Sequence, residues 1–206
     1  MSNSTSFKDY PFLQFKGEQA IIFVHVPRTG GTSLRRQLQL PKPQREKGLR
    51  KHLVVREIIE LVGRPFWEEA YKFAFVRNPW DRLLSVYRRR LKRGVLNEKF
   101  VGLTFADWGK YIINRQKKNN LNPISPQWEM LVNEREELEL NFLGRFENYA
   151  KDFQHIQPLL PNYTPGMHVG RTSTGETYHS SYDQELKEIV EAFYKVDIEQ
   201  FGYSYE

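Results

Sequence analysis

The sequence predicts an α/β protein: a single three-layer domain with a parallel sheet, helices on both faces and a P-loop-like phosphate-binding loop. Three observations predict it. Ala20–Val26 is a short apolar run rich in β-branched and aromatic residues, typical of a buried strand, and a glycine loop and a helical pattern follow it. Lys72–Val76 and Leu138–Phe146 are further strand-like runs, and each leads into a helical pattern. Strands alternating with helices form βαβ units, which bind ligands at the carboxyl ends of the strands.

Length and composition set the domain organisation. The 206 residues fit one domain, and 39% hydrophobic and 14% aromatic residues supply a core. We interpret residues 1–19 as a polar N-terminal segment and residues 20–206 as the domain. The chain has no cysteine, which excludes disulfides, a cysteine nucleophile and thiolate metal sites. The apolar run Ala20–Val24 is too short to span a membrane and no secretory signal is visible, so we expect a soluble, cytoplasmic protein.

The helices follow from periodicity and from helix-ending residues. In the first half, Leu34–Leu40 is predicted to end at Pro41, and Leu53–Val62 at Gly63. Pro79 suits the first turn of a helix, and an apolar stripe follows it. The remaining predicted helices are Thr104–Gln116 with a threonine cap, Glu147–Leu160 ended by Pro161, and a closing helix around Leu186–Tyr194. Asn162–Ser181 is predicted to be a long loop, and loops of that length are often functional.

Basic residues are concentrated in the first half of the chain. Residues 28–56 contain nine Arg or Lys and one acid, and residues 72–93 contain eight and one. From Glu134 to Glu199 there are thirteen acids and six bases. The two basic segments favour a polyanion or a multiply phosphorylated small ligand, although a solvated basic helix face explains Arg88–Arg93 equally well.

The loop after the first strand has the features of a phosphate site. Two glycines allow the backbone to turn tightly and approach a ligand, and two hydroxyls then begin a helix whose N–H groups favour an anion. The sequence is Pro27, Arg28, Thr29, Gly30, Gly31, Thr32 and Ser33. It is not the P-loop of nucleotide triphosphatases, because no lysine precedes Thr32. A glycine turn capped by Thr32 is the structural alternative.

The string Phe23–Leu34 closely resembles the 5′-phosphosulfate-binding loop of sulfotransferases that use 3′-phosphoadenosine 5′-phosphosulfate (PAPS), in particular the carbohydrate-type, family 2-like branch. Phe73–Tyr87 resembles the 3′-phosphate-binding stretch of the same family. Further matches are Gly144–Asn148 with Asp152 and Phe153, and Asp197–Tyr203. The resemblance covers the chain from about residue 20 and implies a metal-free enzyme with PAPS as co-substrate.

The resemblance also implies roles for individual residues. The loop residues Arg28 to Ser33 would hold the 5′-phosphosulfate, and Arg77 with Ser85 would hold the 3′-phosphate. The structural alternatives are a salt bridge from Arg77 to Asp81 or Glu147, and a packing role for Ser85. In the late loop, Arg171 and Ser173 correspond to residues that close over the nucleotide in the family.

Arg28 and His52 are the predicted catalytic residues. Arg28 occupies the position of the family's usual lysine and would stabilise the leaving oxygen. It stays protonated, however, and is therefore a poor proton donor. His52 lies between the two phosphate motifs, where family members place a base, and an ordinary histidine pKa suits that task. It could instead be a phosphate ligand. His25, His155, His168 and His179 are weaker candidates, of which His25 is expected to be a buried strand residue.

The predicted function is transfer of a sulfuryl group from PAPS to a hydroxyl acceptor, a carbohydrate being one candidate. The basic segments favour an anionic acceptor such as an acidic glycan, although PAPS itself accounts for much of the charge. Two alternatives stay open: a P-loop nucleotide-dependent kinase, and a non-enzymatic binder of polyanions or nucleic acid. The missing P-loop lysine argues against the first, and the lack of stacking aromatics among the basic residues argues against the second.

Overall fold

The computed structural model describes residues 10–44, 49–94, 96, 102–116, 121–160 and 178–205. The chain separates into two compact units, which we call unit 1 (residues 1–76 and 129–172) and unit 2 (residues 77–128 and 173–206). The single domain of residues 20–206 therefore stays a prediction.

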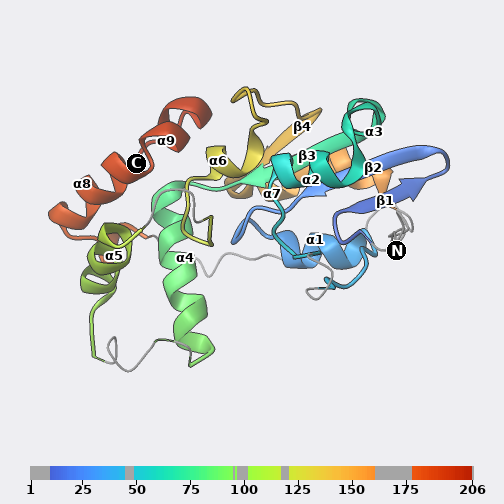
Figure 1. Ribbon diagram of the computed structural model, residues 1–206. Helices are drawn as coiled ribbons and strands as arrows, with labels where there is room; N and C mark the ends of the chain where they lie inside the picture. The colour runs from blue at the N-terminus through green and yellow to red at the C-terminus, as the bar shows by residue number, and fades with distance from the viewer. Residues whose placement is uncertain are drawn as a thin grey trace. The chain divides into compact units, whose positions relative to one another are not determined.

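Unit 1 contains the sheet. Its elements are, in chain order, β1 (Leu13–Lys16), β2 (Gln19–Val24), α1 (Gly31–Gln37), α2 (Val55–Val62), α3 (Arg64–Glu69), β3 (Tyr71–Val76), β4 (Phe142–Arg145), the 3₁₀ helix η4 (Phe146–Asn148), α7 (Tyr149–Ile156) and the 3₁₀ helix η5 (Gln157–Leu159). The four strands lie in the order β1-β2-β3-β4 (Figure 1). This is a mixed α/β architecture with a mostly parallel sheet.

The strand register places the ends of β2 and β3 at the same edge of the sheet. Phe23 pairs with Phe73 in the parallel β2–β3 ladder, and Phe75 pairs with Gly144 in the parallel β3–β4 ladder. A Cβ on Gly144 would lie 2.4 Å from the Phe75 ring, so this position requires glycine. The loop after β2 therefore begins at the carboxyl edge of the parallel strands, as the sequence predicts.

β1 departs from the predicted parallel sheet and lies within the segment interpreted as a polar N-terminal extension. It pairs antiparallel with β2, with Leu13 opposite Ile22. The two strands are joined by a two-residue turn at Gly17, whose φ of 58° suits glycine. Such a hairpin forces antiparallel pairing, because parallel strands need a long crossover.

Helices pack on both faces of the sheet. Phe23, Phe73 and Phe75 share one face and form a core cluster with side chains of α1 and α7, including Leu34 and Phe153. Side chains alternate along a strand, so Lys72 points to the opposite face. There its buried ammonium donates to the carbonyl oxygens of Trp67 and Glu68 at the end of α3, at 2.9 and 3.2 Å.

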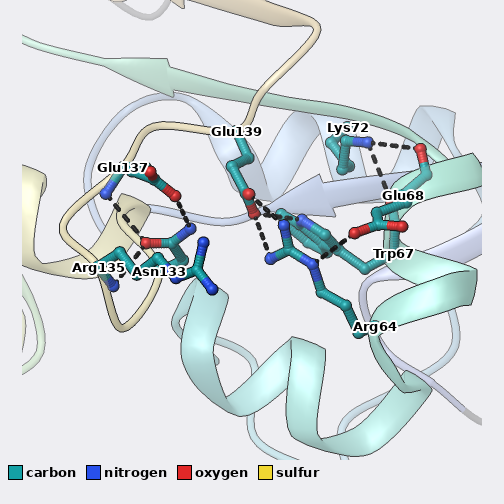
Figure 2. Close-up of polar contacts among 8 residues, drawn as sticks. All are labelled: Arg64, Trp67, Glu68, Lys72, Asn133, Arg135, Glu137 and Glu139. Atoms are coloured by element: carbon teal, nitrogen blue, oxygen red, sulfur yellow. Dashed lines mark hydrogen bonds and ion pairs between the residues drawn. The ribbon is translucent and has the colours of Figure 1, made fainter.

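Further polar contacts hold α3 against the segment before β4 (Figure 2). The carboxylate of Glu139 accepts two hydrogen bonds from the Arg64 guanidinium and one from Trp67 Nε1 at 2.9 Å. The hydrogen bonds from Arg64 lower the pKa of Glu139. The predicted strand Leu138–Phe146 is shortened to β4, because Leu138 instead forms an isolated bridge with Val132.

Unit 2 is helical in its described residues. Its elements are α4 (Pro79–Lys92), α5 (Phe105–Asn114), the 3₁₀ helix η6 (His179–Ser181), α8 (Gln184–Phe193) and α9 (Lys195–Phe201), and α6 (Gln127–Leu131) crosses the boundary between the units. α4 begins at Pro79, and Asn78 caps it by accepting from the Trp80 N–H. Thr104 caps α5 as predicted. Trp80, Trp108 and Leu186 belong to the core that joins α4, α5 and α8.

Buried charges organise the interior of unit 2. The Asp197 carboxylate is fully buried and accepts hydrogen bonds from the backbone N–H groups of Gln127 and Trp128, both at 2.8 Å. Arg82 is also buried and donates to the carbonyls of Pro123 and Ser125. Burial raises the pKa of Asp197, while Arg82 and the hydrogen bonds oppose that rise. The terminal motif Asp197–Tyr203 thus contributes a structural carboxylate.

Candidate active site

The loop between β2 and α1 has two residues with left-handed backbone conformation. Arg28 has a φ of 73° and Gly30 a φ of 81°. A non-glycine residue in this region costs about 1–2 kcal/mol and such conformations are common at functional sites. Thr29 is buried, and its hydroxyl donates to the Val26 carbonyl at 2.9 Å. The Thr29 side chain therefore stabilises the loop itself, and a ligand contact at this residue would have to come from the backbone.

His25 fills the space beneath the loop. Its ring stacks on Phe23, with centroids 5.2 Å apart, and the side chain is 5% exposed. A Cβ on Gly31 would lie 2.2 Å from His25 Cδ2 and Nε2, so only glycine fits where α1 begins. His25 is thus a buried strand residue as expected. Its Nδ1 has no hydrogen-bond partner among the described residues.

His52 lies beside His25. The two ring centroids are 4.4 Å apart, and His52 Nδ1 is 2.9 Å from the backbone oxygen of His25. A carbonyl oxygen only accepts hydrogen bonds, so Nδ1 carries the proton. In the neutral ring Nε2 then holds the lone pair and can take up a proton. His52 is therefore held in the tautomer that a general base requires.

The environment of His52 lowers its basicity. Burial lowers the pKa of His52 to about 4, the hydrogen bond to His25 opposes this effect, and the positive charges of Lys51 and Arg35 add to it. The pKa of His25 is also lowered well below its usual value, first by burial and then by His52, Lys51 and Arg35. The expectation of an ordinary histidine pKa is therefore wrong for His52 in the ligand-free protein. Both rings are neutral at pH 7.

Lys51 is a residue at this site that the sequence reasoning missed. Its ammonium donates a hydrogen bond to Thr32 Oγ1, at 2.9 Å, and Thr32 is exposed at the start of α1. The signal was in the sequence, because Lys51 lies next to His52 within the basic segment 28–56. A contact between residues 19 positions apart could not be read from that pattern.

The chain before α2 is fixed on both sides of His52. Glu57 in α2 forms an ion pair with Arg50 and accepts a hydrogen bond from the Val54 N–H at 3.1 Å. Leu53 and Val54 are buried. These contacts, together with those of Lys51 and His52, attach residues 50–54 to the end of β2 and to the loop. The lone pair of His52 Nε2 and the ammonium of Lys51 therefore belong to one ordered segment.

Arg77 and Ser85, the predicted ligands of the second phosphate motif, lie in unit 2. The guanidinium of Arg77 is almost buried and pairs with Asp81, with Nη2 and Nε each 2.7 Å from Oδ2. This is one of the two salt bridges that the sequence allowed as an alternative for Arg77. The Arg77 backbone is fixed by Gln127, whose side chain accepts from its N–H and donates to its carbonyl oxygen. Ser85 is buried on α4, the helix that also carries Asp81.

Arg171 and Ser173, predicted to close over the nucleotide, and His168 lie outside the described residues. His155 lies on α7 and packs on Phe142, and His179 contacts the backbone oxygen of Tyr205.

Within the part of the chain that the structure describes, no group of three His, Asp or Glu side chains could hold a metal ion. Among the same residues, no helix is long and apolar enough to cross a membrane.

Comparison with known protein families bears directly on this site. A family model described as "Sulfotransferase family" matches residues 13–204, from the first residue of β1 almost to the end of the chain. The chain belongs to the sulfotransferase family. No curated protein and no solved structure shows a significant match to it. Membership supports sulfuryl transfer as the general chemistry of this sulfotransferase, with a sulfonate donor and a hydroxyl acceptor. It identifies the protein as a transferase.

Proposed function

We propose that this sulfotransferase moves the sulfuryl group of PAPS to a hydroxyl acceptor. The observation that carries the proposal is the arrangement around the loop after β2. A histidine held in the base-competent tautomer by the His25 carbonyl, and a lysine ammonium bonded to Thr32, belong to one segment. Sulfuryl transfer requires a proton acceptor for the hydroxyl and positive charge for the donor, and this segment supplies both.

The loop residues suit an anionic group. Gly30 and Gly31 allow the loop to pack tightly on the buried rings of Tyr149 and His25, which a Cβ at either position would meet. Thr32 presents an exposed hydroxyl already bonded to a cation. Arg28 is partly exposed and adds a guanidinium at the start of the loop. We therefore assign the 5′-phosphosulfate to Arg28–Ser33. In this assignment Thr29 contributes its backbone, because its hydroxyl is bonded to Val26.

His52 is assigned the role of general base. Its neutral ring accepts the proton of the acceptor hydroxyl at Nε2 as the oxygen attacks sulfur. The low pKa of about 4 applies to the ligand-free protein. An anion bound next to the ring favours the imidazolium and therefore raises the pKa of His52. Binding of the donor thus increases the basicity of His52 when the base is needed.

Arg77 and Ser85 are assigned to the 3′-phosphate. The Asp81 carboxylate already orients the Arg77 guanidinium through Nε and Nη2. Arginine binds phosphate oxygens through paired N–H groups, and its charge is permanent. Arg171 and Ser173 stay candidates for closing over the nucleotide.

The basic residues in segments 28–56 and 72–93 favour an anionic acceptor, and an acidic glycan is the acceptor class we propose.

Calorimetry with adenosine 3′,5′-bisphosphate tests the donor assignment. We expect this product of PAPS to bind more tightly than adenosine 5′-phosphate, and ATP with magnesium to bind weakly. Arg77→Ala should reduce the affinity for the bisphosphate about 10- to 100-fold, as expected for loss of a charge-assisted pair, and leave adenosine 5′-phosphate unaffected. Arg89→Ala, which removes an exposed arginine of α4, is the control.

Two results would contradict the assignment. Preference for ATP with magnesium would favour a kinase. Steep salt-dependent binding of DNA or RNA, without any rise in melting temperature with the bisphosphate, would favour a non-enzymatic binder.

A further inference from the structure

Lys51 joins the phosphosulfate loop to the residue before the base. Its Nζ donates to Thr32 Oγ1, at 2.9 Å. The next residue, His52, donates through Nδ1 to the backbone oxygen of His25, which directly follows β2. Lys51 is half-buried, whereas Thr32 is exposed. A lysine that served only solubility would extend into water. This one is directed back to the hydroxyl that begins α1, where the donor's sulfonated end is assigned.

Sulfuryl transfer at this loop requires a cation near the leaving oxygen. When the bond from sulfur to the bridging oxygen breaks, that oxygen gains negative charge. Arg28 has a flat, delocalised guanidinium on a residue with left-handed backbone conformation. A lysine ammonium is a compact point charge with three donors, and it can bond Thr32 and an anionic oxygen at the same time.

We propose that Lys51 is a catalytic residue of this sulfotransferase, whose ammonium stabilises the leaving oxygen in place of the lysine usual in the loop. The inference rests on the proposed function. In the step, the acceptor oxygen forms a bond to sulfur, and the bond from sulfur to the bridging oxygen breaks. The electron pair stays on that oxygen as adenosine 3′,5′-bisphosphate departs. The acceptor proton moves to His52 Nε2, and Lys51 keeps its own proton throughout.

The position of Lys51 also affects the base. Burial lowers the pKa of His52 most, and the positive charges of Lys51 and Arg35 lower it further. Among the described residues, His25 also faces the ring. Removing the Lys51 ammonium therefore raises the pKa of His52. Because the base works only when neutral, the acid limb of the rate profile should then move to higher pH. Lys51→Arg keeps a positive charge beside the ring and should leave the acid limb in place.

The test uses the full chain with Lys51→Met, Lys51→Arg and the control Lys195→Met. Lys195 is an exposed cation of α9, outside both basic segments, so its loss changes the net charge equally without affecting residues 50–54 or Thr32. Turnover of PAPS labelled in its sulfuryl group is followed with O-desulfated heparin or water as the acceptor. Adenosine 3′,5′-bisphosphate affinity, melting temperature and the pH profile of kcat are measured for each variant.

We expect kcat to fall about 10²- to 10³-fold in Lys51→Met, as for loss of one transition-state donor, with bisphosphate affinity reduced less than about 10-fold. The acid limb of kcat should shift upward in Lys51→Met but not in Lys51→Arg, and Lys195→Met should behave as wild type. If the wild type is active and Lys51→Met has a normal kcat and an unshifted pH profile of kcat, the catalytic role of Lys51 is wrong and the proposed function is unaffected. A wild type that neither binds the bisphosphate nor cleaves PAPS overturns the proposed function, and the role of Lys51 falls with it.

Discussion

At the scale of single residues, His52 has two properties that a base needs: a fixed tautomer and a neutral ring at pH 7. The first comes from the His25 carbonyl and the second from burial. Asparagine at this position keeps an N–H near the place of Nδ1 and removes Nε2. His52→Asn therefore separates the structural contact from proton transfer.

We expect His52→Asn to lower kcat about 10²- to 10⁴-fold, the usual contribution of general base catalysis, and to change bisphosphate affinity only a few-fold. In the wild type, kcat/KM reports the free enzyme and should fall near pH 4, where His52 protonates. The profile of kcat reports the donor complex, so its acid limb should lie at higher pH. Collapse of bisphosphate affinity in His52→Asn would instead make His52 a ligand contact, with the base elsewhere.

Gly31 is the second residue whose identity the structure explains. Gly31→Ala would place a methyl group 2.2 Å from a buried ring that Phe23 and His52 already enclose. We expect it to destabilise the protein by about 1–3 kcal/mol in urea unfolding, the usual cost of overpacking. A double-mutant cycle provides the control, because His25→Ala removes the clashing ring. Additive effects of Gly31→Ala and His25→Ala would show that the two positions do not meet.

At the scale of elements, α9 supports the second phosphate motif through a chain of hydrogen bonds. Asp197 binds the backbone and side chain of Gln127, and Gln127 in turn holds both backbone polar groups of Arg77. The resemblance identified Asp197–Tyr203 only as a matching motif. The structure gives Asp197 a physical role within unit 2. Asp197 holds Gln127 in place, and Gln127 holds the backbone of Arg77.

Replacing Asp197 with asparagine tests that role. An amide donates where a buried carboxylate accepts, so we expect Asp197→Asn to cost about 2–4 kcal/mol of unfolding free energy, as for other broken buried polar networks. It should also weaken bisphosphate binding while leaving adenosine 5′-phosphate affinity unchanged. Glu199→Gln on the same helix is the control, since Glu199 is exposed and pairs with Lys195 only at 3.7 Å. Equal stabilities of the two variants would disprove the structural role.

The elements also show which features are readable from sequence. β2, β3, α4 and α8 have strong periodicity or continuous apolar runs, and each appears close to its predicted place. β1 was missed because its short strand precedes the first long apolar run. α3 was missed because Gly63 and Pro65 indicated a helix end, although proline also suits a first turn. The position of the glycine loop after β2 was predictable, whereas the roles of His52 and Arg77 stay predictions. The His25–Gly31 contact, the low pKa of His52 and the Lys51–Thr32 bond depend on tertiary packing, which no local pattern contains.

At the scale of the whole molecule, the two buried histidines make stability depend on pH. The pKa values of His25 and His52 are lower in the folded protein than in the unfolded chain, so the unfolded chain binds more protons below about pH 6.5. Their stabilising contribution is therefore complete above that pH and is lost as the pH falls toward about 4 for His52.

We expect the unfolding free energy to fall by about 1 kcal/mol per pH unit for each histidine between about pH 6.5 and 5, mostly above the range where carboxylates titrate. Urea unfolding at a series of pH values measures this slope. His52→Asn should reduce it by about half, leaving the part due to His25. A wild-type stability that stays constant from pH 6.5 to 5 would contradict the burial of both rings.

The most direct measurement is sulfuryl transfer itself. Purified protein is incubated with PAPS labelled in its sulfuryl group and with a panel of hydroxyl acceptors that includes desulfated glycans, in the presence of a chelator. We predict that label passes to at least one acceptor and that adenosine 3′,5′-bisphosphate appears in equal amount. His52→Asn should lower both rates about 10²- to 10⁴-fold while still binding the bisphosphate. Tight bisphosphate binding with no transfer to any acceptor or to water, or full transfer by His52→Asn, would contradict this mechanism.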